Sequence, residues 1–475
     1  MRNIDDHPNE GGGPAGHSRR DEQARDSGFD RFFQTAFRTA MLLIAFITGG
    51  LLTAANLFPG SSIANAYKGG TALYQQLTAY DNVFDTDLWY PERTNKQGVT
   101  QYDAALAKPG LTLYTSGHEA AAYLIDKKGN VVHKWARPFS TVWTKASGIR
   151  KPVPDDHVYF RQAHVFPNGD LLAIYEGAGD TPYGYGMVKL DKDSNVLWTY
   201  WGRTHHAFDV GPDGRIYALT QAIVNKPDPD FSELGTPRIT DFAVILSPEG
   251  QELEKIPLFE AVAKSRYRNL LYGVSAFAVA DPLHSNHISV ITPDMAKNFP
   301  FGKPGQMLVS FRELGLVAVL DADSRKLEWG LRGSWIGQHD PSILDNGHLL
   351  IFDNYGNLDP DWRLTSRVME VDPSTEEVVW KYAGSKDHPL GSLIRGEVER
   401  LDNGNTLITE ASGGRIIEVT PEGKTAWEFV NPVRGGHPGG QVKIPIVNAA
   451  QWIDPATLDF LQQKTATNIQ KDTNS

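Results

Sequence analysis

Histidine and arginine side chains recur at one position of a repeated sequence unit. His206, His339 and Arg161 each stand eight residues before the glycine of a tight turn. His284 opens a similar segment, and Asn286 follows two residues later, on the same face of the expected strand. An imidazole can act as a nucleophile or as a general acid or base, and a guanidinium fork binds sulfate, phosphate or carboxylate oxygens. The combination therefore favours chemistry on an oxyanion.

Two further arginines belong to the same units. Arg312 lies in SFRELG and Arg367 in TSRVMEV, on expected strands of the units that begin with His284 and His339. A metal ion held by histidines alone would be repelled by arginines beside it. We therefore predict a pocket that binds an anion, with no metal and no cofactor.

The repeated unit indicates which elements must position these residues. Each copy has an apolar strand, an Asn-Gly or Asp-Gly turn and a second strand, and a partner segment that ends in tryptophan follows. The clearest copies are HVFPNGDLLAIYEG, HAFDVGPDGRIYALT, HDPSILDNGHLLIFDN and GEVERLDNGNTLITEA. Such turns are typical of β-hairpins, and a repeat of about 40–50 residues with four strands is typical of a β-propeller blade.

Six of these units fit between about Leu111 and Phe429. We therefore predict an all-β fold, a six-bladed β-propeller over residues 109–455. Residues 59–108 are expected to form a linker with a short helix, and residues 456–475 a C-terminal tail. The residue that opens each innermost strand of a propeller faces a shared central channel, which would bring the histidines and arginines together.

Two features of the units concern the closure of the ring. The tryptophans that end the partner segments are expected to pack between adjacent blades, which is a structural role. Residues 444–453, or the strand before Tyr123, are expected to supply the last outer strand. A closed ring leaves no free sheet edge.

An apolar segment near the N-terminus predicts a passage through a membrane. Residues 1–38 are polar over most of their length and are expected to be disordered on the cytoplasmic side. Residues 39–58 carry no charge and are long enough to span a bilayer as a signal anchor or signal peptide. Because Arg31 and Arg38 precede this segment, the positive-inside rule places the propeller on the periplasmic side. Ala66 lies in a sequence that resembles a signal-peptidase site, so secretion after cleavage is the alternative to an uncleaved anchor.

Composition excludes several classes of function. The chain has 475 residues, a formal net charge of −11 and no run of Lys or Arg. Nucleic acid binding requires clustered positive charge, so we expect no nucleic-acid partner. The absence of cysteine excludes disulfides, thiolate metal sites, iron–sulfur clusters and covalently attached c-type haem. The sequence gives no indication of the oligomeric state.

Several segments resemble the bacterial aryl-sulfate sulfotransferases, which are six-bladed propellers exported to the periplasm. The resemblance covers about Tyr114 to Pro432, and its most specific pieces are DPLHSN, SFRELGLVAVLD, GQHDPSILDNGHLLIFDN, SRVMEVD and NGNTLITEASGGRIIEVTPEG. Family members transfer a sulfuryl group from a phenolic sulfate to a phenol through a sulfated histidine. The resemblance implies an aryl sulfate and a phenol as ligands, and it matches His284, His339 and Arg367 to catalytic residues.

The resemblance also implies roles for the matched residues. Arg367 and one histidine would stabilise the charge on the sulfuryl oxygens, and the other histidine would protonate the departing phenolate. His206 is an additional catalytic candidate at the mouth of the channel. The candidate substrate-binding residues are Asn286, Arg312, Arg161 and Arg415.

This sequence departs from the family pattern in its last blade. The nucleophilic histidine of the family is expected about ten residues after Asn405-Thr406, where this chain has Arg415. An arginine stays protonated and cannot be sulfated as a nucleophile. The nearest histidines, His388 and His437, lie in expected loops. Three alternatives therefore remain: a different histidine attacks, the transfer is direct, or the protein binds an anion without turning it over.

Two other functions compete with sulfuryl transfer. The first is a non-catalytic, membrane-tethered propeller that binds an anionic ligand or a protein partner. The second is a quinoprotein-like dehydrogenase, because LDADSRKLEWGLRG resembles the tryptophan-docking repeat of those propellers. Six blades are fewer than such enzymes usually have, and the chain has no vicinal cysteine pair, so the dehydrogenase is the weakest of the three hypotheses.

Overall fold

The computed structural model describes residues 18–54, 82–356 and 366–462. The chain divides into two compact units, Met1–Leu77 and Thr78–Ser475, and each is described by itself. The short helix expected in the linker and the sequence around Ala66 lie outside the described residues. So does the part of the expected tail after residue 462.

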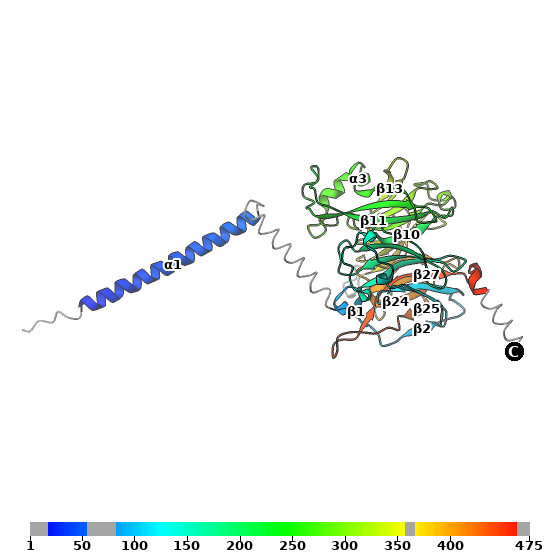
Figure 1. Ribbon diagram of the computed structural model, residues 1–475, viewed down its shortest axis with the longest axis horizontal. Helices are drawn as coiled ribbons and strands as arrows, with labels where there is room; N and C mark the ends of the chain where they lie inside the picture. The colour runs from blue at the N-terminus through cyan, green and yellow to red at the C-terminus, as the bar shows by residue number, and fades with distance from the viewer. Residues whose placement is uncertain (1–17, 55–81, 357–365, 463–475) are drawn as a thin grey trace, which may run out of the picture. The chain divides into compact units, whose positions relative to one another are not determined.

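The first unit contains one long helix, α1 (Ser18–Ala54), drawn in blue in Figure 1. Its segment Phe32–Leu52 has 21 residues, a mean hydropathy of 1.6 and no buried part, and it could cross a membrane by length and composition. The helix begins within the segment that we expected to be disordered. Its apolar part also begins before residue 39, because Phe32, Phe33 and Phe37 extend the exposed apolar surface toward the N-terminus.

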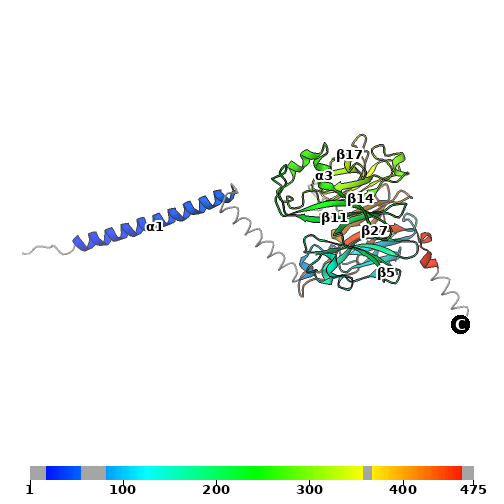
Figure 2. The same cartoon turned by 45° about the horizontal axis from the view of Figure 1, so that its top comes forward.

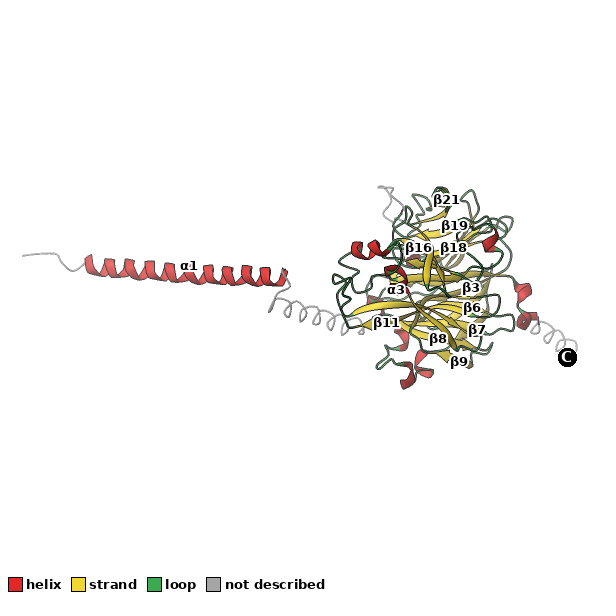
Figure 3. Ribbon diagram, turned by 90° about the horizontal axis from the view of Figure 1, so that it is seen from above, coloured by secondary structure: helices red, strands yellow, loops and turns green. Residues whose placement is uncertain are grey.

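The second unit confirms the six-bladed β-propeller, with six antiparallel sheets of four or five strands each. Figures 1 and 3 show that strands make up most of this unit. From the channel outward, the strands of the first three blades are β27 (Val447–Ile453), β3 (Leu111–Ser116), β4 (Ala121–Asp126) and β5 (Val131–Ala136); β6 (Val158–Val165), β7 (Leu171–Gly177), β8 (Gly184–Leu190) and β9 (Val196–Tyr200); and β10 (Thr204–Val210), β11 (Ile216–Val224), β12 (Arg238–Leu246) and β13 (Glu252–Pro257). Those of the last three are β14 (Ser285–Val290), β15 (Met307–Phe311), β16 (Leu316–Asp321) and β17 (Lys326–Leu331); β18 (His339–Ile343), β19 (Leu349–Asp353), β20 (Arg367–Val371) and β21 (Val378–Tyr382); and β22 (Glu397–Arg400), β23 (Thr406–Glu410), β24 (Arg415–Val419) and β25 (Thr425–Val430).

Smaller elements decorate the ring. A two-stranded sheet joins β1 (Trp89–Pro91) to β26 (Lys443–Pro445). Helix α3 (Leu258–Ala263) packs against β12 and β13 of the third blade and against β17 of the fourth, and Figure 2 shows it beside β17. The short 3-10 helices are η1 (Val83–Asp85), η2 (Phe139–Thr141), η3 (Lys145–Ser147), η4 (Asp155–His157), η5 (Arg268–Gly273), η6 (Met295–Lys297), η7 (Ala411–Gly413) and η8 (Pro455–Thr457).

Segments from both ends of the propeller sequence complete the ring. Strand β27 pairs with β3 and lies next to β6 and β22, the innermost strands of the neighbouring blades. The expectation that this segment supplies an outer strand is therefore wrong: Ala449 and Ala450 are small, buried residues that suit the crowded channel wall. The outer edge of the sixth blade is instead extended by β2 (Gly98–Tyr102), which pairs with β25; the two lie side by side in Figure 1.

Indole groups tie neighbouring blades together. The indole N–H of Trp135 donates to the carbonyl of Gly169 at 2.9 Å, and that of Trp427 donates to Lys127 at 2.9 Å. Each acceptor lies in the turn of the next blade, and both rings are completely buried. Because each ring packs at the junction and its polar atom is satisfied, the structure confirms the structural role expected for these tryptophans.

Candidate active site

The starts of the innermost strands converge on one pocket of about 370 Å³, which we call the mouth pocket. Its walls come from several blades and from the segment before β1. It is lined by Asp87, Tyr159, Glu176, Gly177, Ala178, Gly179, Asp180, Tyr183, His206, His284, Arg312, His339, Ile394 and Arg395. The structure thus brings together three of the four predicted catalytic residues, the histidines, and one of the predicted substrate-binding residues, Arg312.

Irregular backbone aims these side chains into the pocket. His206, His284 and Arg395 have φ values of 54°, 44° and 61°, in the left-handed region that non-glycine residues rarely adopt. The ladders of β10 and β14 also shift register just after their first residues. A bulge inserts one extra residue and redirects the side chains beside it, so each entrance residue turns toward the channel.

His284 is held as a cation by a carboxylate. Its Nδ1 lies 2.6 Å from Oδ2 of Asp281, three residues earlier in the chain. Burial is the largest single influence on the pKa of His284 and would lower it, but the charge and hydrogen bond of Asp281, with the charge of Asp241, together outweigh burial and raise it above its ordinary value. In the same way, burial would raise the pKa of Asp281, and the charge and hydrogen bonds of His284, with the charge of His205, together lower it instead. The pair therefore presents a proton donor to the pocket.

His206, the neighbour of His284, has the opposite electrostatic environment. The two ring centroids lie 4.9 Å apart. Burial, together with the charges of His284 and His205, holds the pKa of His206 well below its ordinary value, so its imidazole is neutral. Glu176 accepts the backbone N–H of His206 at 2.7 Å, which fixes the strained backbone at this residue.

His339 is the third imidazole of the mouth pocket. Its Nδ1 lies 2.7 Å from Oδ1 of Asn354 and 3.0 Å from the carbonyl oxygen of Gly337. Burial and the charge of Arg312 hold the pKa of His339 well below its ordinary value. The pocket therefore contains one cationic histidine and two neutral ones.

Two arginines supply positive charge to the mouth pocket. Arg312 pairs with Glu313. Arg395 donates to the hydroxyl of Tyr159 at 3.0 Å and pairs with Asp87 at 2.9 Å, and its side chain is almost fully buried. Two guanidinium groups beside three imidazoles suit a tetrahedral oxyanion bound in a partly enclosed site.

The sequence model of the arylsulfotransferase family (ASST) matches residues 162–432, which is more than half of the chain. The chain belongs to the arylsulfotransferase family. A search of curated proteins gives no match.

Solved structures similar to this member of the family share little sequence with it. One is a protein of unknown function from Bacteroides caccae, with 13% identity, a TM-score of 0.44 and coverage of 71% of this chain and 99% of that chain. Another is a catalytically inactive virginiamycin B lyase from Staphylococcus aureus, with 10% identity, a TM-score of 0.33 and coverage of 57% and 69%. A third is the WD40 β-propeller domain of Doa1, with 11% identity, a TM-score of 0.37 and coverage of 78% and 99%.

Two arginines singled out through the family resemblance do not line the mouth pocket. Arg367 lies directly opposite Asp353 on the neighbouring strand and pairs with it at 2.9 Å. Arg415 lies directly opposite Glu410 and pairs with it at 2.6 Å. Cross-strand pairs of opposite charge stabilise a sheet, and here each carboxylate holds its guanidinium within the blade.

The other two predicted substrate-binding residues also lie outside the mouth pocket. Asn286 is buried and donates from its amide nitrogen to the carbonyl of Gln338 at 2.6 Å. Arg161 donates to the carbonyl of Asn448 at 3.0 Å and to Glu397 at 3.3 Å. Both residues connect innermost strands of different blades, so their contacts are those of the channel wall.

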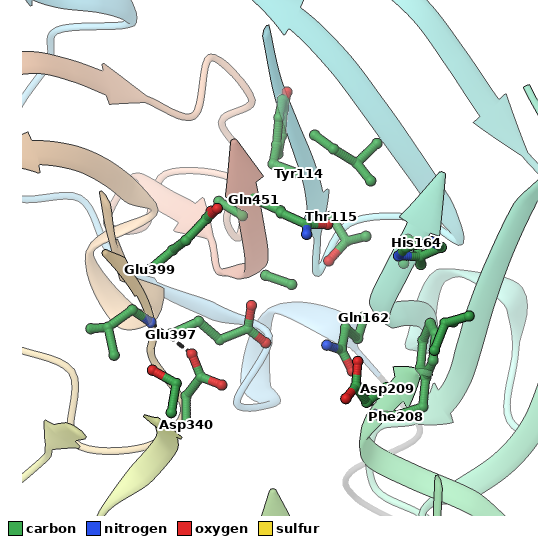
Figure 4. A pocket seen from close by; sticks show the side chains of 17 residues that line it. Tyr114, Thr115, Gln162, His164, Phe208, Asp209, Asp340, Glu397, Glu399 and Gln451 are labelled. Atoms are coloured by element: carbon green, nitrogen blue, oxygen red, sulfur yellow. Dashed lines mark hydrogen bonds between the residues drawn. The ribbon is translucent and has the colours of Figure 1, made fainter. Parts of the chain in front are cut away.

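A second pocket of the channel is acidic. Figure 4 shows Asp340, Glu397 and Glu399 on one side of it, with Asp209 and His164 on the other. Burial raises the pKa of Glu397 to about 8 and that of Glu399 to about 7. Among the residues that the structure describes, no arginine or lysine lines this second pocket, whereas Arg312 and Arg395 line the mouth pocket, so the mouth pocket is the candidate active site for an anionic substrate.

Sequence reasoning did not single out several residues of the site. Asp281 lies in an insertion between the third and fourth blades, and Tyr183 lies between two strands of the second blade, so neither falls in the repeated turn motif. Gly396 stands eight residues before the turn glycine Gly404, as His206 and His339 do before theirs, and Arg395 directly precedes it. This adjacency is the sequence signal that could have found Arg395.

Proposed function

We propose that this propeller transfers a sulfuryl group from an aryl sulfate to a phenolic acceptor at the mouth pocket. The observation that carries the proposal is the ion pair of His284 with Asp281, at 2.6 Å, beside the two arginines of the mouth pocket, Arg312 and Arg395. A histidine held by a carboxylate can give a proton to a leaving group and take one back, and the guanidinium groups suit the sulfuryl oxygens. Membership of the arylsulfotransferase family supports the same reaction class.

Each group has a role that follows from its charge. Arg312 and Arg395 bind the sulfuryl oxygens and stabilise the charge that these oxygens carry in the transition state. His284, protonated and paired with Asp281, donates a proton to the departing phenolate oxygen and later removes one from the acceptor phenol. The rings of Tyr183 and His206, 5.4 Å apart, give the aromatic part of the substrate an apolar wall.

A direct test uses the full chain, solubilised in a mild detergent, with a chromogenic aryl sulfate and a phenol. We expect release of the coloured phenol that depends on the acceptor and that is lost in a His284→Asn variant. The matched control is His348→Ala, because His348 pairs with Glu370 outside the mouth pocket. If the aryl sulfate raises the melting temperature but no sulfate is transferred, the protein is a binding propeller, and the proposal is wrong.

Removing the guanidinium group of Arg395 is expected to lower the rate of sulfuryl transfer. An Arg395→Gln variant should lose about 10²–10³-fold in kcat, the effect of removing one oxyanion-binding donor. Arg400→Gln is the control, because Arg400 ends β22, the strand that follows Arg395, but pairs with Glu370 at 2.8 Å outside the pocket. Steady-state kinetics of both variants test this expectation. Equal kcat values for the two variants would show that Arg395 does not bind the sulfuryl group.

The pH profile follows from the charge states of the histidines. His206 and His339 have lowered pKa values and stay neutral through the neutral range, whereas His284 must be protonated to donate to the leaving group. We therefore expect kcat to be constant near neutral pH and to fall as the pH rises through the raised pKa of His284. In an Asp281→Asn variant this alkaline limb should move to lower pH, because the stabilising charge is removed. An unchanged limb would show that another group titrates.

We propose that the propeller lies on the periplasmic side, held by α1 as a single-pass anchor with its N-terminus in the cytoplasm. The apolar segment Phe32–Leu52 and the arginines near its start support this orientation. Protease added outside spheroplasts should digest the propeller, and the mass of the mature chain should include α1. A mature chain that begins after Ala66 would show a cleaved signal peptide instead.

A further inference from the structure

We propose that His339 is the nucleophile of this protein, attacking through Nε2, and that Asn354 is the positioning residue that leaves this nitrogen free to attack. The inference rests on the proposed sulfuryl transfer. His339 would take the role of the family's nucleophilic histidine, whose expected position is occupied by Arg415 in this chain.

The orientation of the Asn354 amide is settled by two backbone carbonyls. Its Nδ2 donates to the carbonyl oxygen of Ser392 at 2.6 Å and to that of Arg395 at 2.6 Å. A carbonyl oxygen only accepts, so the amide nitrogen must face these two groups. The side chain is completely buried, and the reversed arrangement would set the amide oxygen against two carbonyl oxygens with no proton between them. The amide oxygen therefore faces Nδ1 of His339, at 2.7 Å.

This orientation determines which ring nitrogen of His339 carries the proton. The amide oxygen of Asn354 and the carbonyl oxygen of Gly337, 3.0 Å from Nδ1, are both acceptors without a proton of their own. Nδ1 must then carry the proton, and a neutral imidazole has only one. Nε2 holds the lone pair. Among the described residues, the ring makes its hydrogen bonds through Nδ1 and none through Nε2, and His339 lines the mouth pocket.

Neither of the other two histidines meets these conditions. His284 is protonated beside Asp281 and has no lone pair to offer. Nδ1 of His206 lies 2.8 Å from Nδ1 of His205 and 3.4 Å from the hydroxyl of Tyr183, and both groups can donate or accept. The tautomer of His206 is therefore not fixed by its neighbours. His339 alone combines a neutral ring, a fixed tautomer and a free nitrogen in the pocket.

The two half-reactions balance. The lone pair of Nε2 forms a bond to the sulfur of the aryl sulfate, the bond from sulfur to the aryl oxygen breaks, and its electron pair leaves with that oxygen, which takes the proton of His284. The sulfated ring keeps its Nδ1–H and gains positive charge, which the oxygens of Asn354 and Gly337 stabilise. In the second half, the acceptor phenol gives its proton to His284 and bonds to the sulfur. The sulfur–nitrogen bond then breaks, and its electron pair returns to Nε2.

The first test maps the intermediate. The detergent-solubilised full chain is mixed with an aryl sulfate without acceptor, quenched under alkaline conditions and analysed by peptide mass spectrometry. We expect one sulfuryl group on the peptide that contains His339, lost when phenol is added before the quench. A sulfuryl group on another histidine, or transfer with no protein adduct, would overturn the assignment and leave the proposed function intact. An absence of turnover in the unmodified protein would instead overturn the proposed function.

The second test addresses Asn354. An Asn354→Ala variant should sulfate His339 on the order of 10²-fold more slowly, less than the ~10⁴-fold loss caused by a wrong tautomer in a catalytic triad, because the Gly337 oxygen still accepts the proton. In ¹⁵N NMR, the His339 ring should change from the Nδ1–H form to a mixture, a readout that lost stability does not move. An Asn354→Asp variant keeps an acceptor oxygen but adds a negative charge, so Nδ1 should stay protonated while the pKa of the His339 ring rises. A ring signal unchanged in Asn354→Ala would refute the positioning role.

Discussion

Replacing His284 with asparagine is expected to lower kcat by about 10²–10⁴-fold, the contribution of a positioned general acid. The amide of asparagine can still donate a hydrogen bond to the carboxylate of Asp281, but it has no titratable proton to deliver to the leaving oxygen. The carboxylate of Asp281, 2.6 Å from His284, would then lack its cationic partner. The expected defect is therefore in the chemical step, measured as kcat with a saturating acceptor.

The dependence on the leaving group separates an acid from a binding residue. An aryl sulfate whose phenol is a strong acid leaves as the phenolate without protonation, whereas a weakly acidic phenol needs the proton. The His284→Asn loss should accordingly be larger for the donor with the less acidic phenol, and His348→Ala should show no such trend. Equal losses with both donors would assign His284 to sulfate binding alone.

The largest effect on stability is expected at the junction between the last and first blades. Trp427 is completely buried, stacks on Phe429 at 6.0 Å, and donates its indole N–H to Lys127 in the turn of the first blade. A Trp427→Ala variant should lose about 3–5 kcal/mol of the free energy of unfolding, because it leaves a cavity at the seam. Urea unfolding of the full chain in detergent, followed by circular dichroism, measures this loss.

The equivalent tryptophan of the fifth blade provides the comparison. Trp380 donates its indole N–H to Pro421 at 2.7 Å, also in the turn of the next blade, but its ring is partly exposed. Trp380→Ala should cost less than Trp427→Ala, since water can fill the space that the ring leaves. A Trp380→Ala loss as large as that of Trp427→Ala would show that the hydrogen bond, rather than burial, carries the stability.

The repeat predicted the fold and the place of the site because one signal fixed both. The turn glycines set the register of the hairpins, and the register placed His206 and His339 at the same end of the channel. The first residue of an inner strand is determined by its own blade, so local sequence was sufficient. The family resemblance added the reaction class, which the geometry of the mouth pocket supports.

The sequence could not predict which arginines reach the pocket. Arg367 and Arg415 each face a carboxylate on the neighbouring strand, and such a partner is visible only when the strands are paired. The backbone of Arg395 has a positive φ value, which turns the side chain toward the pocket, and the residue type alone does not predict such a value. The role of β27 as an inner strand depends on which blade needs closing, a property of the whole ring rather than of the segment.

Several residues that open the innermost strands, which we call the blade entrances, have a left-handed backbone, and this conformation sets the stability of their side chains against that of glycine. A side chain in this conformation destabilises the fold by about 1–3 kcal/mol, whereas glycine adopts it freely. In the sixth blade Gly396, with φ 114°, directly follows Arg395, which keeps a side chain at φ 61°. An entrance side chain that contributed nothing to the pocket could be replaced by glycine with a gain in stability, so His206, His284 and Arg395 occupy their entrances at the expense of the stability of the fold.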